Sequence, residues 1–150
     1  KLLIGENERS ARGTPSKATF FVYDIKTKVP SPRIRTGVAG GATLSLDGSK
    51  IFLDEEQEIY SEDKSYIKYD KSLGRIHVYD VAAGKELGVI PFTVDNEGEI
   101  MAIHPNENKI YMMGEIAGVK SLIVVDVINF KVSKTLKISE DTLFMIFYNE

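Results

Sequence analysis

Hydrophobic positions along this chain fall into short runs bounded by Gly, Pro, Asp, Asn or Ser. The runs are rich in Val, Ile, Phe and Tyr, and the run at 109–113, for example, is followed by another at 121–127. β-Branched and aromatic residues between turn residues are typical of strands joined by tight connections. No stretch keeps the period of about 3.6 residues that marks an amphipathic helix. The pattern therefore predicts an all-β protein.

One apolar sequence segment occurs three times, and each copy ends in Asp and an aliphatic residue. A short turn and a predicted strand that begins with Lys follow each copy. The copies are residues 20–25, 76–81 and 122–127. Asp80 and Asp126 are 46 positions apart (126 − 80), whereas Asp24 and Asp80 are 56 apart (80 − 24) because of an insertion. This spacing matches the period of roughly 40–50 residues of β-propeller blades.

The expected strands can be labelled a to d by their place in a blade, and the chain then runs bcd, abcd, abcd, a. We therefore predict a single β-propeller portion of about three four-stranded antiparallel blades. The expected blades are residues 1–35, 42–91 and 99–138, with the start of a next blade at 142–150.

Propellers are rings of roughly 4–8 blades, so a three-blade array would leave a strand edge and half an interface open at each end. One interpretation is that the chain is an excerpt of a longer propeller, whose remainder covers these ends. The other is a homo-oligomer that completes a ring, in which the closing strand at 142–148 of one copy joins the first blade of another.

Charge and composition exclude several classes of function. The formal net charge is −3 and the pI about 5.5, so no basic field exists for nucleic acid or an anionic membrane. No apolar run approaches the roughly 20 residues of a membrane span. The chain has no Cys, which excludes disulfides and thiolate chemistry, and its two His residues show no zinc spacing. We expect no metal ligand and no catalytic residue.

Individual polar residues have structural interpretations. His77 lies mid-strand between Arg75 and Tyr79, where a packed or edge-facing histidine is expected rather than a ligand. His104 stands in a turn, which explains its presence, and no matching histidine stands at this place in another blade. The run Glu-Glu-Gln-Glu at 55–58 lacks the spacing of a calcium loop and is interpreted as solvated.

Alternation along the strands predicts the core, although the alternating partners of these residues are possible too because neighbouring blades cover both faces of a sheet. The predicted core residues are Leu44, Leu46, Ile51, Leu53, Ile76, Val78, Ile100, Ala102, Ile110, Met112, Ile123, Val125, Phe144 and Ile146.

Two phrases resemble a known repeat family. Residues 46–52 and 103–111 are similar to the "SPDGKxLYV" phrase of YVTN-type β-propellers, and 77–85 and 124–132 to the "VxVIDxxTxKV" phrase that follows it. The first phrase is altered here, because its opening reads Ser-Leu-Asp-Gly in one copy and His-Pro-Asn-Glu in the other. The resemblance implies the fold but no particular function, since this repeat occurs in surface proteins, enzyme subunits and lyases.

The two b–c connections at 6–17 and 55–73 are insertions, and both are expected on the face where b–c and d–a connections gather. The second carries Tyr60, Tyr66 and Tyr69 among charged residues. Aromatic residues interspersed with charge are typical of protein-binding surfaces, although the tyrosines could also fold back over the blade edge.

The first insertion points to a narrower resemblance. Residues 6–13, ahead of the strand at 19–24, are similar to the Ser-Arg and Arg-Gly rich insertion in the propeller subunit of quinone-dependent amine dehydrogenases. In that family the quinone is made from Trp and other residues of a separate small subunit. The resemblance implies that Arg9, Arg12 and the Tyr60–Tyr69 loop contact a partner, and that this chain, without Trp or Cys, holds no cofactor.

These observations lead to two functional hypotheses. The first is a non-catalytic propeller scaffold, extracytoplasmic, that binds a protein partner through its b–c loops. The alternative is the propeller subunit of a quinone-cofactor amine dehydrogenase, which is an enzyme only as a complex.

Overall fold

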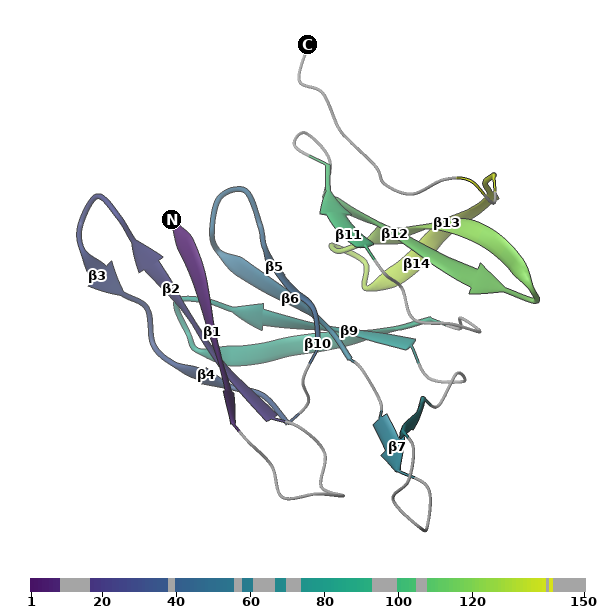
Figure 1. Ribbon diagram of the computed structural model, residues 1–150. Coiled ribbons are helices and arrows are strands. Elements are labelled where there is room, and N and C mark those ends of the chain that lie inside the picture. The colour runs from purple at the N-terminus through teal and green to yellow at the C-terminus, as the bar shows by residue number, and fades with distance from the viewer. Residues whose placement is uncertain are drawn as a thin grey trace. The chain divides into compact units, whose positions relative to one another are not determined.

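A computed structural model of the chain describes residues 1–8, 17–37, 40–55, 58–60, 67–69, 74–92, 100–104, 108–139 and 141 (Figure 1). Over these ranges the regular structure consists of strands β1 to β14, with no helix. By packing, the chain forms two compact units, one made of residues 1–70 and 76–88 and the other of 71–75 and 89–150. The all-β prediction is confirmed.

The first sheet is an antiparallel hairpin with a broken outer strand. Its strands are β1 (Leu2–Glu8), β2 (Lys17–Asp24), β3 (Val29–Pro30) and β4 (Ile34–Arg35). β1 pairs with β2 from Leu2↔Tyr23 to Glu8↔Lys17, so the ends of the predicted insertion at 6–17 extend the hairpin instead of belonging to a loop. β3 and β4 both pair with β2, one after the other.

The outer strand of the first sheet is divided into β3 and β4, and the break has a local cause. Ser31 donates its backbone N–H to the Val22 carbonyl at 2.8 Å, and its Oγ accepts the Val22 N–H at 2.9 Å. The next residue, Pro32, has no N–H to offer to a ladder. The Ser31 side chain therefore takes the place of a main-chain partner at the point where the ladder is interrupted.

The second sheet has the order β10-β9-β6-β5, so that β5, β6, β9 and β10 are the strands a, b, c and d of the meander predicted for a blade. Its strands are β5 (Ala42–Leu44), β6 (Lys50–Asp54), β9 (Gly74–Asp80) and β10 (Lys85–Phe92). Between β6 and β9 the chain forms a separate two-stranded ribbon of β7 (Glu58–Tyr60) and β8 (Ile67–Tyr69).

The third sheet repeats the meander in the order β11-β12-β13-β14. Its strands are β11 (Ile100–Ile103), β12 (Lys109–Ile116), β13 (Val119–Asp126) and β14 (Lys131–Lys137). The register shifts between Val124 and Val125, where β13 meets β14. The described strands thus follow the predicted order bcd, abcd, abcd, whereas the closing strand predicted at 142–148 lies outside the described residues.

Each repeated Asp ends a c strand and organises the turn after it. Asp24, Asp80 and Asp126 are the last residues of β2, β9 and β13. One carboxylate oxygen of each accepts a backbone N–H two or three residues later, at 2.7 to 3.0 Å. This is the hydrogen bond with which Asp competes for the backbone and favours turns. The three Asp residues therefore occupy equivalent places in their sheets, as the sequence repeat requires.

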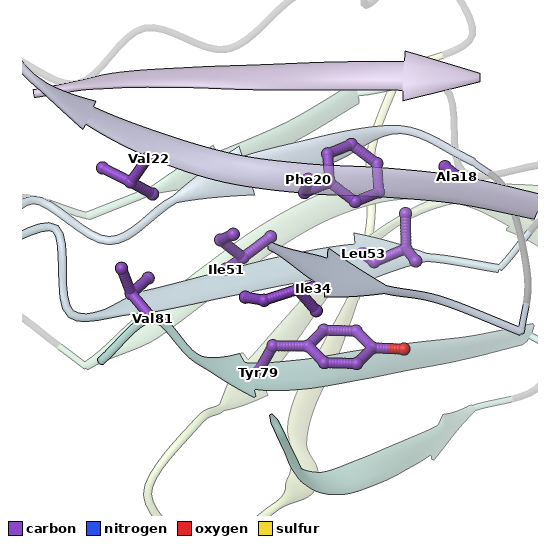
Figure 2. Packing of buried hydrophobic residues seen from close by; sticks show 8 residues of the cluster. All are labelled: Ala18, Phe20, Val22, Ile34, Ile51, Leu53, Tyr79 and Val81. Atoms are coloured by element: carbon purple, nitrogen blue, oxygen red, sulfur yellow. The ribbon is translucent and has the colours of Figure 1, made fainter. Parts of the chain in front are cut away.

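The first two sheets share a core, which Figure 2 shows from close by. Its buried residues are Ala18, Phe20, Val22, Ile34, Ile51, Leu53, Tyr79 and Val81. Phe20 and Val22 alternate on β2 while Ile51 and Leu53 alternate on β6, so one face of each sheet supplies the contact.

Most of the predicted core that can be checked is confirmed. The residues that are fully or almost fully buried are Ile51, Leu53, Ile76, Val78, Ile110, Met112, Ile123 and Val125. Leu44 and Ala102 are half-buried. The Ile100 side chain, Phe144 and Ile146 lie outside the described part.

The prediction for Leu46 is wrong, because 67% of this residue is exposed. Leu46 follows β5 and lies in the a–b turn, which closes where the Ser45 N–H donates to the Lys50 carbonyl at 2.9 Å. Strand alternation therefore stops before residue 46.

Candidate functional site

The b–c connections differ between the sheets. In the third sheet β12 and β13 are joined by a two-residue turn, Ala117-Gly118, with Ile116 opposite Val119. Both turn residues have positive φ, 51° and 72°, as a type I′ hairpin turn requires. The first two sheets carry insertions at this point, so the insertions are features of particular blades.

The second insertion contains the β7–β8 ribbon, whose backbone register is Glu58↔Tyr69, Ile59↔Lys68 and Tyr60↔Ile67. Two of the three predicted contact tyrosines, Tyr60 and Tyr69, are thus placed on paired strands of one ribbon. Tyr66, Arg9 and Arg12 lie outside the described residues, so their predicted contacts with a partner stay predictions.

A chain of polar side chains lies at the base of this insertion, and we call Glu55, His77 and Glu86 the His77 bridge. His77 on β9 has its Nε2 3.0 Å from Glu55 Oε2 and its Nδ1 3.1 Å from Glu86 Oε2. Glu55 follows β6, where the insertion begins, and Glu86 is on the outer strand β10. The exposed fractions of the side chains are 6% for Glu55, 13% for His77 and 42% for Glu86.

Tyr79 completes the surroundings of the bridge. Its ring stacks on the His77 ring with centroids 6.3 Å apart and planes inclined by 17°. Burial raises the pKa of Tyr79, and the charge of Glu86 and a hydrogen bond to it act in the same direction. The phenol therefore stays protonated and provides a donor for the Glu86 carboxylate.

The bridge corrects one interpretation of the sequence and confirms another. Glu55 is not solvated, contrary to the interpretation of the acidic run, because its side chain is buried against β9. His77 is a packed strand histidine, as expected. The sequence signal for the bridge was the alternation of Arg75, His77 and Tyr79 on one strand, but the partners 22 residues before and 9 residues after His77 are brought in by the register of three strands.

Among the described residues, no group of three or more His, Cys, Asp or Glu side chains is arranged to hold a metal ion. The two carboxylates of the His77 bridge bind different ring nitrogens, so they do not converge on one point. Within the same ranges there is also no helix that is long and apolar enough to cross a membrane.

No protein-family model matches the chain. No curated protein matches it either. Among solved structures, it is similar to the β-propeller domain of the Trilobed protease from Pyrococcus furiosus, which was described as having an open velcro topology, with 14% sequence identity and a TM-score of 0.60. The match covers 93% of this chain and 41% of that chain, so this chain spans less than half the length of the protein it matches.

The described sheets and this likeness define the class of protein. The chain is all-β and forms part of a β-propeller, with about three blades of antiparallel strands. An identity of 14% supports the fold alone and carries nothing about activity.

Proposed function

We propose that this chain is a non-catalytic propeller scaffold that binds a protein partner through the b–c insertions of its first two blades. The observation that carries the proposal is the β7–β8 ribbon, a paired structure inserted where the third sheet needs only two turn residues. Propeller blades give loops a rigid base, and loops on rigid bases are where binding residues concentrate.

The composition of the ribbon supports a protein as the ligand. Tyr60 and Tyr69 stand on paired strands, opposite Ile67 and Glu58 respectively. Tyrosine supplies large contact area at low cost in side-chain entropy, and flanking charges set orientation. The ribbon follows β6, and this strand is anchored in the core shared by the first two sheets. Leu53, one residue before the end of β6, is completely buried there.

The test replaces the second insertion by the short connection that the protein already uses elsewhere. Residues 56–74 are exchanged for Ala-Gly, which joins Glu55 to Arg75 in the register of β6 on β9 and copies the turn between β12 and β13. A second variant keeps the insertion and carries Tyr60→Ser and Tyr69→Ser. Proteins retained by each immobilised chain from the source cell extract are identified by mass spectrometry, and each identified candidate is then purified and titrated by calorimetry.

We expect one defined protein to bind the native chain and to lose at least about tenfold in affinity in both variants, which corresponds to about 1.4 kcal/mol. Leu46→Ser, which changes an exposed residue in an a–b turn, serves as the control and should bind as the native chain does. Equal affinity of the native chain and the variant without the insertion would disprove the proposal.

The resemblance of residues 6–13 to the propeller subunit of amine dehydrogenases favours one particular partner, a small extracytoplasmic subunit that carries a quinone. Its test is co-expression with the neighbouring reading frames of the source genome. Co-purification of a small Trp- and Cys-rich chain with quinone absorbance would support this partner, and a colourless chain with any other partner would reject it.

A further inference from the structure

The His77 bridge has a stereochemical requirement that the scaffold role does not explain. Both ring nitrogens of His77 face a carboxylate oxygen at hydrogen-bonding distance, Nε2 that of Glu55 and Nδ1 that of Glu86. An ionised carboxylate only accepts hydrogen bonds, and a neutral imidazole donates from one nitrogen only. Both contacts are hydrogen bonds when the imidazole carries a proton on each nitrogen.

Burial strengthens the interaction on the Glu55 side. With 6% of its side chain exposed, the Glu55 carboxylate has little water around it, and a buried carboxylate needs charged or donating partners. Glu86 is more exposed and receives the Tyr79 phenol as well as His77. Loss of one proton from His77 would leave a ring lone pair directed at one of these carboxylates.

The charged and titratable groups around His77 come from three strands. Glu55 directly follows β6, Glu86 lies on β10, and β9 itself carries Tyr79 and, two residues before His77 on the same face, Arg75. The residues that the first sheet contributes to the shared core are apolar.

We propose that the His77 bridge is a proton-controlled tie that fastens the start of the second insertion, at Glu55, to β9 and β10 when His77 is doubly protonated. Imidazole is the side chain that ordinarily gains and loses a proton between pH 5 and 8. The tie is therefore tight at the acidic end of this range and weaker at the alkaline end. Its role in regulating partner binding rests on the proposed function, whereas the tie itself is a property of the chain alone.

The tie is measured by backbone hydrogen exchange of the whole chain between pH 5 and 8. The quantity followed is the protection of residues 51–55 and 58–60 relative to that of 110–113 in β12, because the ratio removes the intrinsic dependence of exchange on pH. We expect the relative protection to fall by roughly tenfold from pH 5 to pH 8, the size of one charge-assisted hydrogen bond.

Three variants give the test its specificity. In His77→Gln the ratio should be independent of pH, and in Glu55→Gln its dependence should be at least halved. His104→Gln removes the only other histidine and should leave the dependence unchanged. The imidazole ¹⁵N spectrum of the native chain, with two histidines to assign, should show both His77 nitrogens protonated at pH 5.

A ratio that stays flat in the native chain, or a dependence that survives in both His77→Gln and Glu55→Gln, would overturn the tie. Should His77→Gln not fold, Glu55→Gln and the nitrogen spectrum decide by themselves. A pH-dependent ratio with no partner binding would support the tie and reject the scaffold role, whereas partner binding with a flat ratio would do the reverse.

Discussion

Lys28 and Gly84 occupy the same position in two successive blades, four residues after the Asp that ends the c strand, and both have a left-handed backbone, with φ of 61° and 64°. In each turn the N–H of this residue donates to the carbonyl of that Asp, at 2.8 Å from Lys28 and 3.0 Å from Gly84. Phe130 holds the same place after Asp126, with φ of 51°. The turn geometry is therefore a property of the repeat, and only one of the three copies has the glycine that suits it.

This relationship predicts opposite effects of exchanging the two residues. A left-handed conformation costs an L-residue about 1–2 kcal/mol, whereas glycine loses roughly 0.5–1 kcal/mol through its freedom in the unfolded chain. Lys28→Gly should therefore raise the free energy of unfolding by up to about 1 kcal/mol in denaturant titrations.

Gly84→Ala should lower the free energy of unfolding by about 1 kcal/mol or more. The added Cβ would be strained by φ and would lie 3.1 Å from Pro32 Cβ. Gly41→Ala is the control, because an added Cβ there has nothing within 4 Å, and it should be neutral or slightly stabilising. Equal effects of the two Gly→Ala changes would contradict the prediction.

The β12–β13 hairpin offers a second stabilising change. Ala117 holds the first position of a type I′ turn, where Asn is favoured because its side chain tolerates positive φ. Ala117→Asn should stabilise the chain by about 0.5 kcal/mol, measured by the denaturant midpoint at constant m-value. Ala83→Asn, in a turn position without positive φ, should stay within about 0.5 kcal/mol of zero, and a gain at residue 83 equal to that at 117 would count against the turn as the cause.

Substitution of a buried and of an exposed leucine tests where the core of the first two sheets lies. Leu53 is completely buried between the first two sheets, and Leu53→Ala should lower the free energy of unfolding by about 2–5 kcal/mol through lost burial and a residual cavity. Leu46 is 67% exposed in its turn, so Leu46→Ala should cost less than about 0.5 kcal/mol. Denaturant unfolding of both variants measures this, and similar losses at the two sites would show that the shared core is wrongly placed.

Acid should weaken the turns through their aspartates. The Ser45 hydroxyl first, and then the Ser49 N–H and hydroxyl, lower the pKa of Asp47 to about 2, and turn hydrogen bonds lower the pKa values of Asp24 and Asp126 as well. An unfolded Asp titrates near pH 3.9. Because the folded value is the lower one, the stability from Asp47 is present above about pH 4 and is lost as the pH falls through about 2.

The measurement compares wild type and Asp47→Asn. Between pH 5 and pH 2 the free energy of unfolding should fall more steeply in wild type, because the variant has no carboxylate to protonate at this site. Parallel slopes would mean that the turn hydrogen bonds of Asp47 contribute nothing to the acid sensitivity.

The sequence by itself determined the features that depend on neighbouring residues. Asp24, Asp80 and Asp126 each accept a hydrogen bond from a backbone N–H two or three residues later. The same residue at the same place therefore produces the same turn in each sheet. Strand alternation likewise identified the faces of β6 and β12, because the side-chain period of a strand is local.

Only the tertiary structure decided what depends on residues distant in the chain. Glu55 meets His77 because the register of β6 on β9 sets Leu53 opposite His77 and so places residue 55 diagonally across from residue 77. The break in the outer strand of the first sheet arises where Ser31 bonds across to Val22, and the exposure of Leu46 arises where a turn ends the alternation. Sequence patterns specify turns and the side-chain period of strands. Strand register and the packing of one sheet on another decide which charged side chain is buried, because burial requires two surfaces that meet only in the folded chain.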